Sequence, residues 1–380
     1  MSPDLLSTLG LQPFRPRPPW LNGDLQTLRD SLRPVQLPPE TGLPVEIPVG
    51  GGDRLLALLD QPLASGAEAM SSAPCQPLGL VLLMHGLGGS SEREGLRRMG
   101  WTLQHAGFAV LRLNMRGAGP GRTLARGTYA ARCNSDLLPA IRRARELAAG
   151  RPLLGMGISL GGTKLLNALL AEAEERQAAG LAPEGPLLDG LVCISSPLDL
   201  DVCSRQIEAP RNRLYQRWLL QRLVQQTLAD PFGVADAERI ALEGRAPGGP
   251  LRSIRDFDAA ITAPRWGYAD VEAYYRQASP IHGLLGGSAP GSLPPTLIVH
   301  AADDPWVPVS SAERLAASAL ATAQGGSSPW DVLITAQGGH NGFHARCDDR
   351  SGREPGNWGD RLTARWMRRQ VGVSPDPDQR

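Results

Sequence analysis

The chain has 380 residues, and its 39 basic and 38 acidic side chains leave a formal net charge of +1. This balance argues against a strongly basic nucleic-acid binder or a polybasic membrane anchor. Hydrophobic residues make up 42% and charged residues 20%, which is a globular composition, and 44 glycines with 34 prolines predict many loops.

Short apolar segments alternate along the chain with segments of helical periodicity. We expect strands at 79–84, 109–114, 153–158, 190–195, 297–301 and 331–335, and helices at 92–105, 135–149, 160–177 and 359–370. Continuous apolar strands that alternate with helices are typical of a parallel sheet with helices on both faces. The pattern therefore predicts an α/β protein with a mostly parallel central sheet.

One stretch, between Pro197 and Pro295, interrupts this alternation. It contains no clear strand, and helical patterns occur at 214–228 and 271–277. An insertion here would lie over the carboxyl ends of the strands, where ligands bind in open α/β sheets. We read it as a helical lid or cap, with a packed helical subdomain that has no gating role as the alternative. The expected domains are a packed N-terminal arm (1–42), a core (43–200 and 293–370), the insertion (201–292) and a disordered tail (371–380).

The cysteines give no sign of a covalent or metal framework. There are five, and none forms a C-x-x-C pair: Cys75, Cys133, Cys193, Cys203 and Cys347. Buried free thiols in a reducing cytosol are the simpler interpretation. The N-terminus lacks the basic start and apolar core of a signal peptide, and no apolar run approaches the ~20 residues that span a bilayer. We therefore expect a cytoplasmic protein without stable membrane insertion.

A candidate nucleophile lies at the junction of a predicted strand and a predicted helix. The sequence GISLGG at 157–162 is a G-x-S-x-G motif centred on Ser159. Such a tight reversal lifts the serine oxygen clear of the sheet, at a helix N-terminus that favours developing negative charge. A helix N-cap serine is the structural alternative.

Serine needs an adjacent base at neutral pH, and the chain has six histidines. In this arrangement the base should lie in the loop after the last strand. GGHNG at 338–342 follows the strand 331–335 and presents His340, and His344 is the second candidate. His105 falls on a helix and His300 in a strand, so we expect both to be structural.

The acid that orients the base should follow the strand before the last one. AADDPWVP at 301–308 does so, and Asp304 fits the D-x-x-V-P register, with Asp303 as the alternative. Such a carboxylate accepts the imidazole N–H, fixes the tautomer and stabilises the imidazolium. The chain order serine, aspartate, histidine is that of α/β-hydrolases.

A glycine-rich segment follows the first central strand. HGLGGS at 85–90 allows backbone N–H groups to point inward, so we expect an oxyanion site made by the N–H groups of Leu87 and Leu160. His85 would then be a structural residue at the strand end. A phosphate site is less favoured, because neither G-K-[ST] nor G-x-G-x-x-G is present.

Several longer segments now carry a resemblance to a known family. They are PPWLNGDLQTL, HGLGGSSE, NMRGAG, GISLGGTKLL, ISSPLDL, DFDAAITAPRWGYADVEAYYRQAS, AADDP and GGHNGF. From about residue 18 to 366 the chain resembles the YheT-type branch of the α/β-hydrolases, related to the ABHD1/ABHD3-like esterases and lipases. Asp24 and Thr163 depart from that pattern, which often has histidine and asparagine there.

The resemblance implies the α/β-hydrolase fold and hydrolysis of carboxylic esters, with short or medium acyl chains or lipids as substrates. Acyl transfer to a small alcohol through the same triad is the first alternative, and a non-catalytic binding protein is the second. No cofactor or metal is expected, and the partner is a small ester with an apolar acyl chain rather than nucleic acid. Candidates to line an acyl pocket, with core packing as the alternative, are Trp218, Leu219, Leu220, Phe257, Trp266, Tyr268, Tyr274 and Tyr275.

Overall fold

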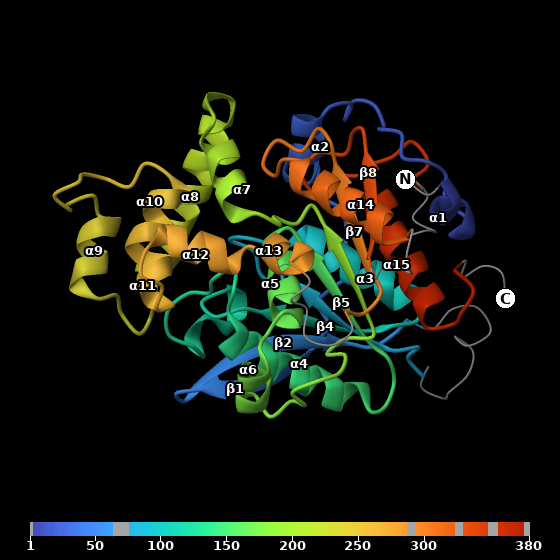
Figure 1. Ribbon diagram of the computed structural model, residues 1–380, viewed down its shortest axis with the longest axis horizontal. Coiled ribbons are helices and arrows are strands. Elements are labelled where there is room, and N and C mark those ends of the chain that lie inside the picture. The colour runs from blue at the N-terminus through green and yellow to red at the C-terminus, as the bar shows by residue number, and fades with distance from the viewer. Residues whose placement is uncertain (1–2, 64–75, 287–292, 324–329, 349–355, 376–380) are drawn as a thin grey trace.

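A computed structural model describes residues 3–63, 76–286, 293–323, 330–348 and 356–375. Its centre is an eight-stranded sheet in the order β1-β2-β4-β3-β5-β6-β7-β8 (Figure 1). β2 pairs antiparallel with β1 and β4, and the other neighbours pair parallel. The strands are β1 Leu43–Gly50, β2 Asp53–Asp60, β3 Leu80–Met84, β4 Ala109–Asn114, β5 Leu153–Ile158, β6 Gly190–Ile194, β7 Thr296–Ala301 and β8 Trp330–Thr335. The predicted mostly parallel sheet is confirmed.

Helices cover both faces of this sheet. One face carries α1 Pro3–Thr8, α3 Glu94–His105 and α15 Trp358–Gln370. The other carries α4 Asn134–Ala148, α5 Leu160–Leu169, α13 Pro280–Leu285 and α14 Ser310–Ala323. Side chains of β3 alternate between the two cores, with Leu80, Leu82 and Met84 in one and Val81 and Leu83 in the other. A strand that is buried on both faces has a continuous apolar sequence, and this is why β3 could be predicted from the sequence.

A lobe of short helices lies between β6 and β7 in the sequence and beside the sheet in space (left in Figure 1). The predicted helices 214–228 and 271–277 correspond to two of its members, α8 and α12. Its elements are α7 Leu200–Glu208, η3 Pro210–Asn212, α8 Arg213–Leu228, α9 Asp236–Leu242, α10 Ile254–Phe257, η4 Asp258–Thr262, α11 Ala263–Arg265 and α12 Val271–Ala278. Tyr274 and Tyr275 pack with Leu160 of α5, so the lobe shares a hydrophobic cluster with the core.

The long helix predicted for 160–177 is wrong. The chain forms α5 and then a separate α6, Ala173–Ala178, which begins with a capping box between Glu172 and Glu175. The buried guanidinium of Arg176 donates to the carbonyls of Leu169 (2.9 Å) and Ala171 (3.1 Å). Because these donors satisfy carbonyls at the end of α5, the helix ends there instead of continuing.

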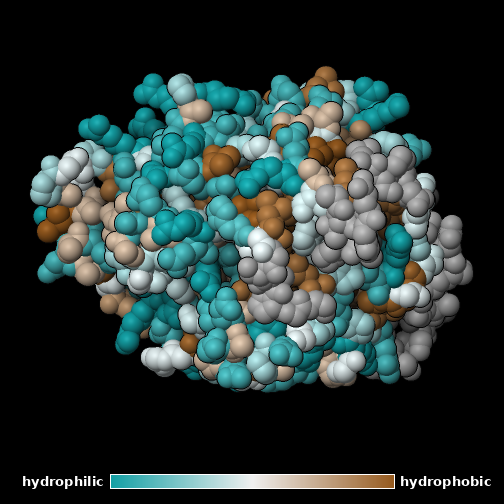
Figure 2. All heavy atoms as spheres, viewed as in Figure 1, coloured by the Kyte–Doolittle hydropathy of each residue, from teal (hydrophilic) through white to brown (hydrophobic). Residues whose placement is uncertain are grey.

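Several regular elements were not predicted from the sequence, including β1, β2 and α14 and shorter helices such as α7 and α9. Strand β1 is partly exposed and contains two prolines, so it shows no continuous apolar run, whereas β2 contains the apolar run LLALL but is also partly exposed. Helix α14 also lacked a distinct pattern. Before the sheet, the chain forms α2, Gly23–Leu32, and the 3-10 turn η2, Gly119–Thr123, follows β4. On the face shown in Figure 2, hydrophilic residues predominate and hydrophobic ones form separate patches.

The cysteines only partly match the expected buried thiols. Cys133 and Cys193 are buried and free, but Cys203 is half-buried and Cys347 is exposed in the loop between β8 and α15, and Cys75 lies outside the described residues. None of the helices in the described part combines the length and apolarity that a bilayer crossing requires. Of the tail expected to be disordered, residues 376–380 also lie outside the described chain.

Candidate active site

Ser159 occupies the turn from β5 into α5. Its φ of +53° lies in the left-handed region, which non-glycine residues adopt at an energetic cost and mostly at functional sites. The flanking glycines permit this turn because the backbone is crowded on both sides. A Cβ at Gly157 would lie 2.2 Å from the Gly162 nitrogen, and one at Gly161 would lie 2.4 Å from the Met84 carbonyl oxygen. The G-x-S-x-G spacing therefore follows from the sterics of this reversal.

The loop after β8 brings His340 to Ser159. The distance from His340 Nε2 to Ser159 Oγ is 2.9 Å, and that from His340 Nδ1 to Asp304 Oδ2 is 2.8 Å. A carboxylate only accepts hydrogen bonds, so Nδ1 carries the proton and Nε2 is free to accept the serine O–H. Three predicted side chains, separated by up to 181 residues, thus form one hydrogen-bonded chain.

Of the two adjacent aspartates, Asp304 reaches the imidazole. Its other oxygen, Oδ1, accepts the N–H groups of Trp306 (2.8 Å) and Val307 (3.0 Å). Burial alone would raise the pKa of Asp304, but the charge and hydrogen bond of His340 hold that pKa below its ordinary value. Asp303 instead accepts the N–H of Gly339, next to His340, and so helps to hold the histidine loop.

The remaining candidate histidines point elsewhere. His344 Nε2 lies 3.0 Å from Asp30 Oδ1, on helix α2. His300 is buried in β7 and bonds the Val307 carbonyl at 3.0 Å. His105 ends α3. The structure therefore brings one histidine, His340, to the serine.

The glycine-rich turn after β3 lies directly against Ser159. A Cβ at Gly86 would come within 3.0 Å of the Ser159 Cβ. The hydroxyl oxygen of Tyr129 accepts the N–H of Gly88 at 2.8 Å and holds the turn in place. His85 is buried behind it, where desolvation lowers its pKa to about 3, and its Nε2 accepts the N–H of Met115. A neutral imidazole with both ring nitrogens in hydrogen bonds fits the structural role predicted for His85.

A cavity of about 250 Å³ opens above Ser159 and His340. Both residues predicted to supply oxyanion donors, Leu87 and Leu160, line it. Most of the other wall is apolar and comes from the helical lobe, including Leu219, Leu223, Phe257, Tyr274 and Tyr275. Four of the eight suggested pocket residues do not line it: Trp218, Leu220, Trp266 and Tyr268. Trp218 lies on the outer face of α8, 47% exposed.

Sequence reasoning missed three residues beside the triad. Gln26 and Thr27, on α2, contact the backbone of the loop that carries His340. Trp306 also lies against the imidazole, with the ring centres 4.5 Å apart. The only sequence signal for Gln26 and Thr27 was the segment PPWLNGDLQTL, which supports the family resemblance but indicates no role for either residue.

The fold and this constellation define the class of the protein. A family model described as "alpha/beta hydrolase fold" matches residues 79–345, about 70% of the chain, and the protein belongs to that family. Within it, the chain is similar to YheT-type and ABHD3-type proteins, as the sequence motifs indicated.

Two relatives illustrate the similarity. The Escherichia coli protein named "Putative esterase YheT" is 30% identical over 66% of this chain and 69% of its own length. Phospholipase ABHD3 of Mus musculus is 27% identical over 69% of this chain, but the match spans only 58% of the mouse protein. A crystal structure of a soluble variant of monoglyceride lipase from Saccharomyces cerevisiae has a TM-score of 0.54 at 16% identity, covering 89% of this chain and 98% of that one. That likeness concerns the fold.

Proposed function

We propose that this protein is a serine hydrolase that cleaves carboxylic esters with an apolar acyl group. The observation that carries the proposal is the hydrogen-bonded chain Ser159–His340–Asp304 at the floor of an apolar cavity. The relatives named as esterase and phospholipase support the same reaction class.

In the proposed cycle, Ser159 Oγ attacks the ester carbonyl carbon while His340 Nε2 takes its proton. The resulting oxyanion accepts hydrogen bonds from the N–H groups of Leu87 and Leu160, each worth on the order of 10²- to 10³-fold in kcat. The alcohol leaves with the proton from His340, and the acyl group remains on Ser159. Water, deprotonated by His340, then releases the acid and restores the serine. Asp304 keeps the imidazole in the required tautomer throughout.

We further propose that the lobe from α7 to α12, within the insertion predicted at 201–292, forms a cap whose inner face binds the acyl chain. The apolar wall of the cavity is supplied largely by α8, α10 and α12, while the reacting groups come from the core. An acyl chain in that cavity would place its carbonyl carbon next to Ser159. This arrangement favours esters with an extended apolar acyl group over acetate.

A fluorophosphonate probe and a series of p-nitrophenyl esters test the proposal. We expect the wild type to be labelled and to prefer acyl chains longer than acetate. Ser159→Ala should abolish labelling and lower kcat on the order of 10⁶-fold, as loss of a triad nucleophile does, with an unchanged circular dichroism spectrum. An unlabelled wild type would favour a non-catalytic binding protein, and an optimum at acetate would contradict the apolar acyl site.

Acyl transfer to an alcohol is the second candidate. One relative is the Saccharomyces cerevisiae protein named "Medium-chain fatty acid ethyl ester synthase/esterase 2", which is 25% identical over 60% of this chain and 52% of its own length. The same acyl-enzyme would then react with a small alcohol in place of water. Product analysis with ethanol in the ester assay separates the two reactions. Both release the substrate's alcohol, but hydrolysis gives the free acid as the acyl product, whereas transfer gives an ethyl ester.

A further inference from the structure

The N-terminal motif at residues 18–28 has no place in the cycle above, yet it lies against the triad. We propose that helix α2, which this motif forms, is a positioning element that holds the loop of His340 through the side chains of Gln26 and Thr27. The inference rests on the proposed function, since it assigns these residues a role in orienting the base of that reaction.

Thr27 makes the most direct contact. Its hydroxyl donates to the carbonyl of Gly23, one turn earlier in α2, at 2.6 Å. The same oxygen accepts the backbone N–H of His340 at 2.8 Å. The helix thus orients the hydroxyl, and the hydroxyl in turn fixes the backbone from which the imidazole projects. A shift of this N–H would change the distances from the imidazole to both Ser159 and Asp304.

Gln26 holds the loop four residues further on. Its side chain is 1% exposed and bonds the backbone of His344 twice: Oε1 accepts the N–H at 2.8 Å and Nε2 donates to the carbonyl at 3.0 Å. The second proton of Nε2 goes to the carbonyl of Trp20 at 2.7 Å. The Gln26 amide thus bonds both the backbone N–H and the carbonyl of His344, as a paired strand would. Thr27 and Gln26 therefore hold the histidine loop at two points, His340 and His344.

Glycines on both sides allow the backbones to touch. A Cβ at Gly23 would lie 2.0 Å from the carbonyl oxygen of Asp303, beside the triad acid. A Cβ at Gly339 would lie 2.3 Å from the Gly23 oxygen, and one at Gly342 would lie 2.7 Å from the Gln26 oxygen. The start of α2 therefore lies against the acid loop and the base loop together.

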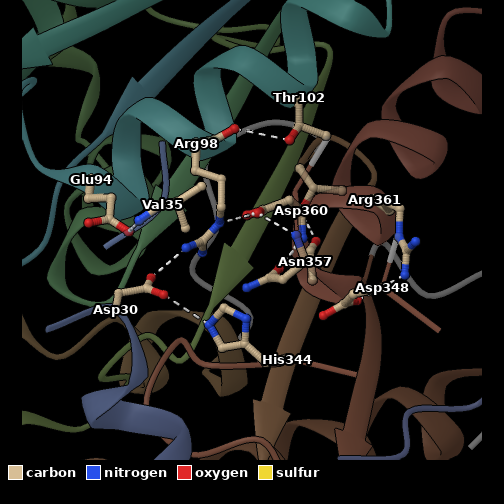
Figure 3. Close-up of polar contacts among 12 residues, drawn as sticks. Asp30, Val35, Glu94, Arg98, Thr102, His344, Asp348, Asn357, Asp360 and Arg361 are labelled. Atoms are coloured by element: carbon tan, nitrogen blue, oxygen red, sulfur yellow. Dashed lines mark hydrogen bonds and ion pairs between the residues drawn. The ribbon is translucent and has the colours of Figure 1, made fainter. Parts of the chain in front are cut away.

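The far end of α2 is anchored by charge (Figure 3). Asp30 forms an ion pair with Arg98 of α3 and lies 3.0 Å from His344 Nε2. Arg98 also bonds Asp360 of α15 at 2.6 Å, and all but Asp30 are buried. A second cavity, of about 260 Å³, separates this cluster from the ring of His340 and is bordered by Gln26 and Asp30. Helix α2 therefore contacts the histidine loop through Gln26 and Thr27 and contacts α3 near its end through Asp30.

Ordinary helix docking does not account for this interface. A helix that packs for stability buries its leucines, but the buried residues of α2 are Gly23 and Gln26. Leu28 is 37% exposed and Leu32 is 60% exposed. The side of α2 that faces the protein presents polar groups that hydrogen-bond the backbone of the histidine loop. Such an interface fixes the position of the loop but buries little apolar surface.

Steady-state kinetics of Thr27 variants on a p-nitrophenyl ester test the proposal. Thr27→Val removes the acceptor for the His340 N–H at nearly constant shape, and we expect kcat to fall about ten- to a hundredfold, as sub-ångström to ångström misplacement does, with KM nearly unchanged. Thr27→Ser retains the hydroxyl and should restore most of kcat. Gln26→Met, a second variant of similar size, should show the same selective loss of kcat.

Thr363→Val is the matched control. Thr363 is buried in α15, and its hydroxyl donates to the carbonyl of Gly359 one turn earlier at 2.9 Å, as Thr27 does in α2. This control should lose thermal stability without losing kcat. Wild-type kcat in folded Thr27→Val and Gln26→Met would overturn the proposal. A wild type without esterase activity or fluorophosphonate labelling would instead overturn the proposed function.

Discussion

The carboxyl group of Asp258 lies in the wall of the apolar cavity. Tyr275 O–H donates to it at 2.9 Å, and burial raises its pKa to about 6. An ordinary aspartate in the unfolded chain has a pKa of about 3.9. Since the folded pKa is the higher one, the folded state binds the proton more tightly, and Asp258 favours folding most at low pH. That contribution is lost as the pH rises through about 6.

Asp258→Asn should remove this pH dependence. A pKa shift of about two units corresponds to about 3 kcal/mol, so the variant should be more stable than the wild type by up to about that amount at pH 8. At pH 4 the two proteins should differ little, because the carboxyl group is then largely protonated in the folded state. Urea unfolding of both proteins at the two pH values measures the difference. Equal differences at pH 4 and pH 8 would contradict the raised pKa.

Single residues also show what the sequence can and cannot predict about the site. Ser159 and His340 were recognisable because strand–turn–helix sterics and chain order constrain them locally. The structure favours Asp304 over Asp303 through a contact that spacing alone did not decide. Thr27 was not predictable, because it meets His340 across 313 residues and nothing in its local pattern indicates that contact.

Among the elements, the pair α5 and α6 shows how one side chain can end a helix. Residues 160–177 contain no proline and end in strong helix formers such as Ala, Glu and Arg, so propensity alone would extend a single helix. Arg176, 2% exposed, instead donates to Leu169, Ala171 and also the carbonyl of Gly185 at 3.0 Å. The break coincides with hydrogen bonds from Arg176 to carbonyls five to nine residues away, which a helical pattern does not reveal. The central strands were predicted well because their own residues are continuously apolar.

Arg176→Met should destabilise this junction. It leaves three carbonyls without their charged donor, and each such loss costs about 1–3 kcal/mol, so we expect the free energy of unfolding to fall by about 3 kcal/mol or more. Arg143→Met is the control, because Arg143 is exposed on α4 and pairs with Glu146 at the surface. Such exposed pairs contribute about 0–1 kcal/mol. Denaturant unfolding compares them, and similar losses in both variants would refute the role of Arg176.

At the scale of the whole molecule, the site lies between two parts with different roles. The core supplies the side chains proposed to react, at the carboxyl edge of its parallel strands, where they were expected from the sequence. The lobe supplies the apolar wall, and its helix α8 has two contrasting faces. Leu219 lines the cavity and is 5% exposed, whereas Leu214, on the same helix, is 83% exposed.

This contrast gives a matched pair of substitutions. Leu219→Trp should fill part of the cavity and shift the preference among p-nitrophenyl esters toward shorter acyl chains, while activity on acetate is retained. Leu214→Trp introduces the same side chain on the outer face and should leave the chain-length profile unchanged. The ratio of kcat/KM for long and short esters is the measurement. An unaltered ratio in Leu219→Trp would mean that the acyl chain binds elsewhere.

The contacts between α2 and the histidine loop join residues 318 positions apart. During synthesis α2 leaves the ribosome well before the histidine loop that it contacts. A nascent chain that has emerged only to the end of β7 already contains Ser159 but neither Asp304 nor His340. Catalytic competence would therefore arise only after the histidine loop has been synthesised and has met α2.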